Sequence, residues 1–483
     1  MVSAMIDSIL FANNYGTAEV RKLFDDATMV QNWLDVESAL AQTQAEMGLI
    51  PQEAADEISR KAHVENMDLA KIGHDVDAIH HSLVPTLRAL QSICENGAGE
   101  YIHLGLTTQD VIDTGFIISI KKGFKIIYDN VLACENQLIE MIKKYRDTAM
   151  PGRSHTQQGV PITFGYKCAN WASEIERDLL RMEQCYQRCF VGELFGALGT
   201  MAGFGAHGME VSDRTIKRLG LDIPNISWHT SRDRMAEICH TISITCCTLG
   251  RMGNEMAKLQ MTEIGEITEG FTPGEVSSST MPHKRNPNGL EALQCLARLV
   301  KGEATTAQES MFCEHERDGA LWKIEWKAVN ECIILASACT AKGAQILAHL
   351  EVHPERMQEN LFIAKGLMMS ERIMMALGQK IGKQTAHEVV YELAMQAFEG
   401  KHQFREMLLN SPVITNNLTK EEIDQLLDPN TYTGLAGEIC DRVVTSIGIS
   451  RSKSKLQAKV KIFPNIHRQT PEDEDLLVTY SGA

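Results

Sequence analysis

The segment from Ser277 to Pro287, SSSTMPHKRNP, contains the residue types that most clearly suggest chemistry. Three serines precede two cations, Lys284 and Arg285, and the amide of Asn286. A lysine can neutralise negative charge that develops on a carboxyl group, and an asparagine amide can donate a hydrogen bond to it. The segment therefore suggests binding and reaction of a carboxylate. Taken alone, however, a surface loop that happens to be basic explains it better.

A second polar cluster, PGRSHTQQGVPITFG, runs from Pro151 to Gly165 and places His155 between Arg153 and Gln157. Histidine is a natural general acid or base near neutral pH. A lone histidine is more often a capping or hydrogen-bonded residue, so this cluster does not identify an active site by itself.

A third cluster, HLGLTTQDVIDTG, precedes a helix that we expect from Val111 onward. Its hydroxyl and amide side chains can hold a carboxylate against the free backbone N–H groups of a helix start; these residues are Thr107, Thr108 and Gln109. An ordinary helix cap at Thr108 or Asp110 explains the same residues equally well.

Proline placement indicates the elements that must position these clusters. Residues 86–150, 225–272 and 288–353 contain no proline, and proline breaks helix interiors, so long helices can occupy these stretches. In the middle stretch apolar residues recur every three or four positions, as on the buried face of a bundled helix; they are Met235, Ile238, Ile242, Cys246, Leu249, Met252, Met256 and Leu259. The sequence predicts an all-α fold around a central bundle, with the three clusters as loops.

The composition excludes several classes of protein. At 483 residues, two or three subdomains are expected. A net charge of −16 argues against non-specific nucleic-acid binding, which needs a basic surface. No apolar run approaches the roughly 20 residues of a membrane span, and the N-terminus resembles neither a secretory nor an import signal.

The thirteen cysteines are an odd number and are scattered along the chain. Cys134, Cys246 and Cys295 lie in apolar helical patterns, which favours buried free thiols and a cytoplasmic location. Cys185 and Cys189 could share a helix face, but no second pair follows at zinc spacing. We therefore interpret them as packing residues and predict no metal site.

Together, the three clusters resemble the signature blocks of the fumarase/aspartase superfamily. SSSTMPHKRNP is similar to its signature loop, usually GSSxMPxKxNP, with Ser277 where glycine is common. GLTTQD and GRSHTQQGVPITFG are similar to its first and second substrate-binding blocks, and the likeness extends to about residue 450. The resemblance implies a three-domain helical subunit, here divided into an N-terminal domain, a central bundle, a C-terminal domain and an extra tail at residues 1–105, 106–355, 356–450 and 451–483.

The resemblance also implies catalytic roles. Ser278 would be the base that removes a proton from the carbon beside a carboxylate. Lys284 and Asn286 would stabilise the resulting aci-carboxylate intermediate. His155 would be the general acid that protonates the leaving group, and Glu291 would orient and charge this histidine.

The same resemblance suggests further substrate contacts. The residues that would grip the carboxylates are Thr107, Thr108 and Gln109. His74, in GHDVDAIHH, resembles a second active-site histidine of adenylosuccinate lyases, although His80 and His81 leave the register open. Arg232, in SWHTSRDRMAEI, is a further predicted contact.

Members of this superfamily need no cofactor, and their products are typically fumarate and an amine or another leaving group. They assemble as homotetramers in which each active site takes one cluster from each of three subunits. The resemblance thus implies a small dicarboxylate substrate and a homotetramer, with no nucleic-acid or membrane partner.

Two branches of the superfamily compete. GLTTQDVIDTG and MPHKRNP resemble the group of adenylosuccinate lyase and 3-carboxymuconate cycloisomerase, and three other stretches are closer to the cycloisomerase: SWHTSRDRMAEI, EHERDGALWKIEW and LDPNTYTGLAGEICDRVV. Asp318 to Trp322, DGALW, offers no phosphate donors beyond its backbone, and the N-terminus lacks the early Arg-Tyr pair of adenylosuccinate lyases. Both features argue against a purine nucleotide substrate.

His155 with Glu291 favours expulsion of a leaving group that needs a proton. The predicted function is reversible β-elimination of fumarate from an N-substituted aspartate (succinyl) compound. Three alternatives remain open: a lactonising 3-carboxy-cis,cis-muconate cycloisomerase, the adenylosuccinate lyase of purine synthesis, and a crystallin-like structural protein that has kept the fold.

Overall fold

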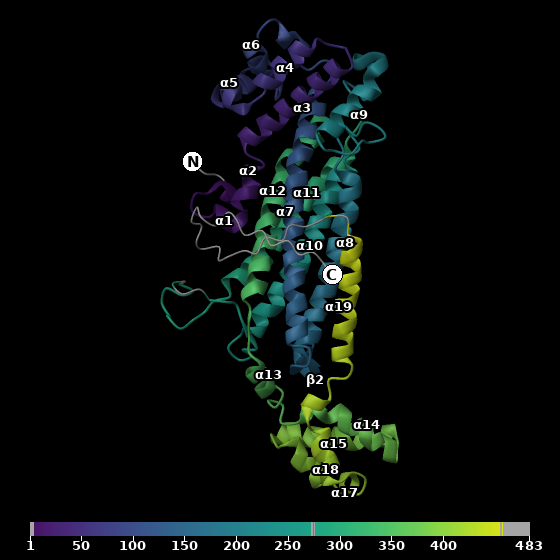
Figure 1. Cartoon of the computed structure of the whole chain (residues 1–483). Coiled ribbons are helices and arrows are strands. Elements are labelled where there is room, and N and C mark those ends of the chain that lie inside the picture. The colour runs from purple at the N-terminus through teal and green to yellow at the C-terminus, as the bar shows by residue number, and fades with distance from the viewer. Residues whose placement is uncertain (1–3, 272–273, 275, 455, 457–483) are drawn as a thin grey trace.

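The N-terminal part of the chain consists of short helices around one long helix, α3 (Asp26–Glu46). The computed structural model describes residues 4–271, 274, 276–454 and 456. Helix α3 begins where the Asp25 carboxylate accepts the backbone N–H of Thr28 at 2.8 Å, a typical N-cap bond. The short helices of this region are α1 (Ala12–Tyr15), α2 (Ala18–Lys22), α4 (Gln52–Lys61), α5 (Leu69–Ile79) and α6 (Val84–Ile93). Helix α9 (Gly208–Arg218) joins them by packing on α3 at the upper end of the molecule (Figure 1).

The middle of the molecule is a bundle of five long helices, as the proline-free stretches predicted. They are α7 (Thr108–Lys144), α8 (Phe164–Cys189), α10 (Asp233–Leu259), α11 (Asn288–Gln308) and α12 (Gly319–His349). The predicted apolar stripe of α10 is confirmed, because all eight of its residues are at most 3% exposed. Burial of such side chains contributes roughly 1.5–3 kcal/mol each, so the stripe holds α10 in the bundle.

Helix α12 is apolar on all sides because it lies against α7, α10 and α11. By length and composition it is the one helix among the described residues that could cross a membrane, but 78% of the qualifying window is buried inside the protein. Its composition therefore matches its place in the core.

The C-terminal part has a core of its own, formed by α14 (Ser370–Ile381), α15 (Lys383–Gly400), α16 (Phe404–Leu409), α17 (Pro412–Thr415) and α18 (Lys420–Leu426). Helix α13 (Pro354–Asn360) leads into it from the bundle, and α19 (Ala436–Lys453) leads back. Helix α19 packs on α8 and α7 of the bundle, whereas α14 to α18 share a separate core, so the division at residues 356–450 stays a prediction. Arg451, the first residue of the predicted extra tail, is bonded to the bundle: its Nε donates to the buried Glu135 carboxylate at 2.6 Å. Most of that tail, residues 457–483, lies outside the described residues.

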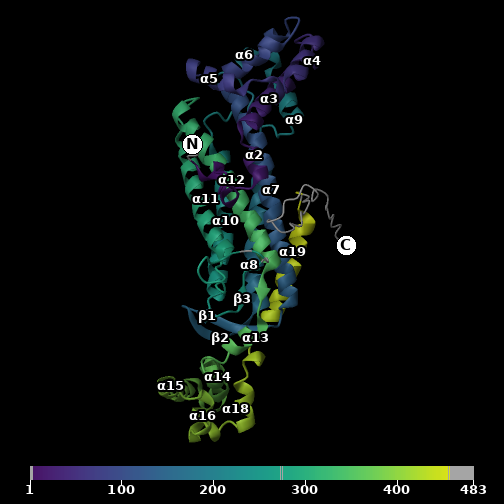
Figure 2. The same ribbon diagram turned by 90° about the vertical axis from the view of Figure 1, so that its left-hand side faces the viewer.

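The cluster from Pro151 to Gly165 was predicted as a loop, but it forms an antiparallel hairpin of β1 (Ala149–Ser154) and β2 (Gln157–Thr163) followed by the start of α8. Its two-residue turn consists of His155 and Thr156, whose φ angles are 50° and 70°. Such turns usually contain Asn or Gly, and their absence hid the hairpin from sequence reasoning. Figure 2 shows this hairpin at the lower end of the bundle, near the small pair of β3 (Ile267–Thr268) and β4 (Glu351–Val352).

Candidate active site

The first predicted cluster forms the N-terminus of α7. Thr107 is the N-cap residue, so the helix begins at Thr108, three positions earlier than the expected start at Val111. The Asp110 carboxylate accepts the backbone N–H of Thr107 at 3.0 Å, as in a capping box. The hydroxyl groups of Thr107 and Thr108 therefore stand at the positive end of the α7 dipole, where an anion is favoured.

Gln109 is 1% exposed, and its amide is engaged within the protein. Its Nε2 donates to the Asp113 carboxylate at 3.1 Å and to the carbonyl of His229 at 2.9 Å. Its Oε1 accepts from Arg317 at 3.3 Å, and another nitrogen of Arg317 donates to the Thr107 hydroxyl at 2.7 Å. In this geometry Gln109 positions the α7 start, which differs from its predicted contact with substrate. Sequence reasoning missed Arg317, although the residue lies in a stretch noted for its likeness to the cycloisomerase.

A buried polar network supports the start of α7 from below. Asp110 accepts from the backbone N–H groups of Phe195 at 3.1 Å and Gly196 at 2.8 Å, and from His229 Nε2 at 2.9 Å. Glu193 lies beside it, 3.6 Å from the same His229 nitrogen. Burial, together with the negative charge of Asp110, raises the pKa of Glu193 to about 9, so this carboxyl is protonated at neutral pH.

Arg232 belongs to the same buried region and has no free donor. Its guanidinium donates to the Asp113 carboxylate at 2.7 and 3.2 Å, to Glu325 through Nε at 2.9 Å and through one Nη, and to the Trp228 carbonyl at 3.5 Å. It also stacks over the Trp228 ring at 4.7 Å. These contacts occupy all five of its N–H groups, so none is left to donate to a substrate as predicted. In this structure Arg232 is the centre of a buried ion-pair network.

The histidines near this end separate clearly. The side chain of His74 is 82% exposed, with Asp75 at 3.5 Å as its ion-pair partner. His81 instead lies with its Nε2 at 3.5 Å from the Thr108 hydroxyl. Of the histidines in GHDVDAIHH, it is therefore His81 that reaches the first cluster within one chain, whereas His74 faces outward.

The third cluster is an exposed loop that leads into α11. The Ser278 hydroxyl is half-buried and accepts the backbone N–H of Met281 at 3.1 Å. Asn286 donates to the carbonyl of Ser277 at 2.7 Å, which ties the two ends of the loop together. The side chain of Lys284 is exposed. The loop thus presents its serine and its lysine at the surface rather than in a closed pocket.

Glu291 stands exposed in the first turn of α11. That turn is fixed by Glu269, whose carboxylate accepts the backbone N–H groups of Gly289 at 3.0 Å and Leu290 at 3.2 Å. The carboxylate at this helix start is thus supplied by Glu269, which leaves Glu291 on the outer surface. His155 is likewise exposed, at the tip of its hairpin.

The first and second clusters lie at opposite ends of the bundle (Figures 1 and 2). Helix α7 begins in the first cluster and has 37 residues, and the hairpin of His155 follows its other end. At a rise of 1.5 Å per residue this helix is roughly 55 Å long. One chain therefore cannot bring Thr107 and His155 to the same substrate.

Comparisons with known proteins identify the family. Residues 14–302 match the family model described as "Lyase", and residues 366–443 match "Adenylosuccinate lyase C-terminus". The chain belongs to the fumarase/aspartase superfamily of lyases. This confirms the predicted family and the all-α fold.

This lyase is 41% identical over 444 residues to "N-acetyl-S-(2-succino)cysteine lyase" of Dickeya dadantii, covering 92% of this chain and 98% of the relative. It is 38% identical to "Adenylosuccinate lyase" of Methanocaldococcus jannaschii, over 90% of this chain and 94% of the relative. Among solved structures, it is similar to the 3-carboxy-cis,cis-muconate lactonizing enzyme of Pseudomonas putida, with a TM-score of 0.87 and 31% identity over 92% of this chain and all of the other. The chain is thus similar both to an adenylosuccinate lyase and to a muconate lactonizing enzyme. This agrees with the prediction that it belongs to the group that contains these two enzymes.

Proposed function

We propose that this lyase catalyses the reversible β-elimination of fumarate from a small succinylated substrate. The observation that carries the proposal is the 41% identity, across nearly the whole chain, to a lyase whose name specifies a 2-succino substrate. Ser278 would be the base, and Lys284 and Asn286 would stabilise the aci-carboxylate that forms when the proton leaves. His155 would protonate the leaving group, with Glu291 as its orienting carboxylate.

The loop geometry supports this role for Ser278. A serine is a poor base unless nearby donors stabilise its alkoxide. The Ser278 oxygen already accepts one backbone N–H, from Met281, and the exposed Lys284 is on the same short loop. Closure of the loop over substrate would exclude water, strengthen this hydrogen bond and increase the effect of the Lys284 charge.

The 55 Å separation of the first two clusters supports a homotetramer with shared active sites. Each site would combine Thr107 and Thr108 of one subunit, His155 of another and Ser278 of a third. His74 remains a proposed contact, because its exposed ring is free to meet a neighbouring subunit. Ser278→Ala and His155→Ala subunits, unfolded and refolded together, should regain part of the activity that each variant lacks, measured with an N-succinyl substrate, on which both variants are expected to be nearly inactive. If the refolded mixture stays inactive while wild-type chains treated in the same way recover activity, shared sites are excluded.

The helix start of α12 speaks against a nucleotide substrate. The Asp318 carboxylate accepts the backbone N–H groups of Ala320 at 2.9 Å and Leu321 at 3.2 Å, and it accepts that of Glu314 at 3.3 Å. A substrate phosphate at this helix start would meet a negative charge that already occupies its donors. This feature supports a phosphate-free substrate over adenylosuccinate.

The relatives support sulfur as the leaving atom, as in a 2-succino thioether of cysteine, and the N-substituted aspartate predicted from the sequence is the second candidate. A panel assay separates them. N-acetyl-S-(2-succino)cysteine, an N-succinyl amino acid, adenylosuccinate and 3-carboxymuconate are each incubated with the enzyme. Fumarate is followed by its ultraviolet absorbance, and lactone by chromatography. The proposal predicts fumarate from the thioether; lactone formation from 3-carboxymuconate alone would overturn it.

His155→Ala distinguishes the two leaving atoms on one enzyme. A thiolate is a stable leaving group, since the pKa of cysteine is near 8.5, whereas an amine must be protonated before it leaves. We expect a small loss of kcat with the thioether and a loss of about 10²–10⁴-fold with an N-succinyl substrate. Equal losses with both would show that His155 does not act on the leaving group.

A further inference from the structure

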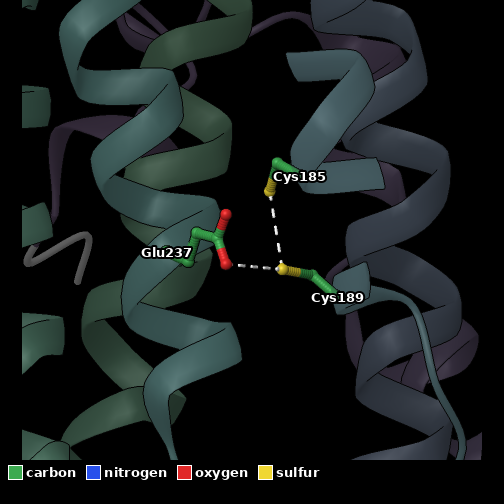
Figure 3. Close-up of side chains that lie close together, drawn as sticks. All are labelled: Cys185, Cys189 and Glu237. Atoms are coloured by element: carbon green, nitrogen blue, oxygen red, sulfur yellow. Dashed lines mark hydrogen bonds between the residues drawn. The ribbon is translucent and has the colours of Figure 1, made fainter. Parts of the chain in front are cut away.

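The last turn of α8 and the first turns of α10 bring together two thiols and a carboxylate that the proposed reaction does not use. Figure 3 shows Cys185, Cys189 and Glu237 pointing toward one another across the two helices. The Sγ atoms of the two cysteines lie 3.7 Å apart, and Cys189 Sγ lies 3.4 Å from a Glu237 oxygen. The three ligand atoms all lie within 4.8 Å of one another. Both cysteines are fully buried, whereas the Glu237 side chain is 29% exposed.

These separations match the edges of a zinc tetrahedron. With Zn–S near 2.3 Å and Zn–O near 2.1 Å, neighbouring ligands lie about 3.8 Å apart for two sulfurs and about 3.6 Å apart for sulfur and oxygen. A disulfide fits less well, because residues four apart on a helix keep their Cβ atoms about 5–6 Å apart while a disulfide needs about 3.5–4.5 Å. The arrangement therefore suits a shared cation better than a covalent bond between the sulfurs.

The neighbouring charges also suit a divalent cation. Arg188 Nε donates to Glu237 at 2.9 Å, and a terminal nitrogen of the same guanidinium bonds the other carboxylate oxygen. This contact fixes the orientation of the carboxylate, as partners of metal ligands commonly do. Two thiolates and one carboxylate carry three negative charges, which a divalent cation and the Arg188 guanidinium together cancel.

We propose that Cys185, Cys189 and Glu237 bind a thiophilic divalent cation of the Zn²⁺ class. Among the residues that the structure describes, no fourth His, Cys, Asp or Glu joins the group, so water completes the tetrahedron from the exposed side of Glu237. Sequence analysis noted the two cysteines but predicted no metal site, because the third ligand, Glu237, lies on another helix, 48 positions after Cys189. Thiolates select this class of metal over magnesium or calcium.

The site would fix the polypeptide that leads to the first cluster. Cys189 ends α8, and the backbone N–H groups of Phe195 and Gly196, six and seven residues later, hold Asp110 at the start of α7. A cation that joins α8 to α10 at this point would clamp one end of that connection. Its effect is therefore expected on stability and on the order of this segment, not on the chemical step.

Binding must release thiol protons. The hydrogen bond with Cys185 and burial raise the pKa of the Cys189 thiol, so this thiol must give up its proton when it binds a metal. Metal affinity should therefore rise as the pH increases, with protons released on binding.

The experiment is a titration of the full-length, chelator-treated protein with Co²⁺ and then Zn²⁺. We expect one Co²⁺ per chain, with the thiolate-to-cobalt charge-transfer absorption and the visible bands of tetrahedral cobalt, both of which Zn²⁺ removes. The background variant Cys247→Ser/Cys295→Ser removes two exposed thiols that could bind metal adventitiously. Cys185→Ser/Cys189→Ser in that background should lose the charge-transfer band, and E237Q should weaken binding without loss of fold.

The matched control is Cys246→Ser/Cys339→Ser, which changes two buried thiols on facing helices that have no such carboxylate beside them; it should keep the band. Circular dichroism and the melting temperature establish that each variant is folded, and Zn²⁺ should raise the melting temperature of the control but not of the Cys185/Cys189 variant. An unchanged cobalt spectrum in the latter variant would overturn the proposal. So would a Cys185–Cys189 disulfide found by peptide mass mapping of the purified protein.

Discussion

The start of α7 and the loop before α11 both contain predicted site residues, but they differ in almost every physical respect. At the start of α7, Asp110 and Gln109 are buried, and each is held by three or more hydrogen bonds. In the loop, Lys284 is exposed, and the hydrogen bonds that hold the turn, among them those at Ser278 and Asn286, lie at the surface or only half-buried. The first region has the rigidity of the preformed carboxylate support that we propose, whereas the second has the freedom that the proposed closing loop would need.

The largest effect is expected in the loop. Ser278→Ala should lower kcat by about 10²–10⁴-fold, because it removes the proposed base. The melting temperature should stay unchanged, since the serine makes one hydrogen bond and is only half-buried. The neighbouring exposed Ser279→Ala is the matched control and should keep most of the activity. Equal activity of the two variants in a fumarate-release assay would remove Ser278 from the mechanism.

The next effect tests the rigid region. Arg232→Met leaves Asp113 and Glu325 buried without their cation, and breaking such a pair typically costs about 3–5 kcal/mol. On α10, which begins directly after Arg232, Arg251→Ala removes an ion pair whose arginine is 44% exposed, worth about 0–1 kcal/mol. Denaturant unfolding measures both. A stable Arg232→Met protein with a raised KM would instead return Arg232 to substrate binding.

An effect of pH is also expected. The pKa of Glu193 is raised to about 9 in the folded chain, so above its unfolded value near 4.3 the unfolded state loses a proton that the folded state keeps. Stability from this group is complete below about pH 4 and decreases as the pH rises toward 9. Glu193→Gln keeps the neutral shape and should flatten that decrease. Melting temperatures at pH 6 to 9 measure the slopes, and parallel slopes in both proteins would contradict a protonated Glu193.

The smallest effect concerns Thr107. Thr107→Val removes the hydroxyl that accepts from Arg317 and weakens the cap of α7, at a cost of about 1 kcal/mol. If the hydroxyl also holds a substrate carboxylate, KM should rise while kcat stays nearly constant. Thr114→Val is the control. Thr114 lies farther along α7, and its buried hydroxyl is bonded to the backbone of Glu193, so this variant should lose stability without losing a contact to substrate. If KM rises equally in both variants, Thr107 stabilises the start of α7 and does not bind substrate.

The bundle could be predicted from the sequence because its information is local. The spacing of Met235 to Leu259 and the absence of proline in long stretches each follow from the geometry of one helix. The hairpin could not be predicted, because His155 and Thr156 adopt positive φ angles that their residue types disfavour. Cys295 was expected to be buried like Cys134 and Cys246, but it is exposed on α11 because an apolar neighbourhood in sequence does not fix which face of a helix is covered.

The candidate site was predicted in its residue types but not in its contacts. Gln109 and Arg232 read as donors for a substrate, whereas their partners, Asp113 and Glu325, come from positions that no local pattern connects to them. Arg317 was overlooked for the same reason. Such pairings depend on how the helices pack, so they cannot be inferred from one sequence without its fold.

Because α19 returns to the bundle, removing it should have a different effect from removing the helices that precede it in the sequence. Residues 366–431 are topologically an insertion, since the polypeptide leaves the bundle through α13 and rejoins it at α19. A stop codon just before Ala436 would therefore remove part of a wall, exposing the contacts of Cys440 and Ile447 with the main core. A short linker that replaces only the inserted helices, α14 to α18, would leave α19 packed on the bundle. The inserted helices are therefore more dispensable for the main core than α19.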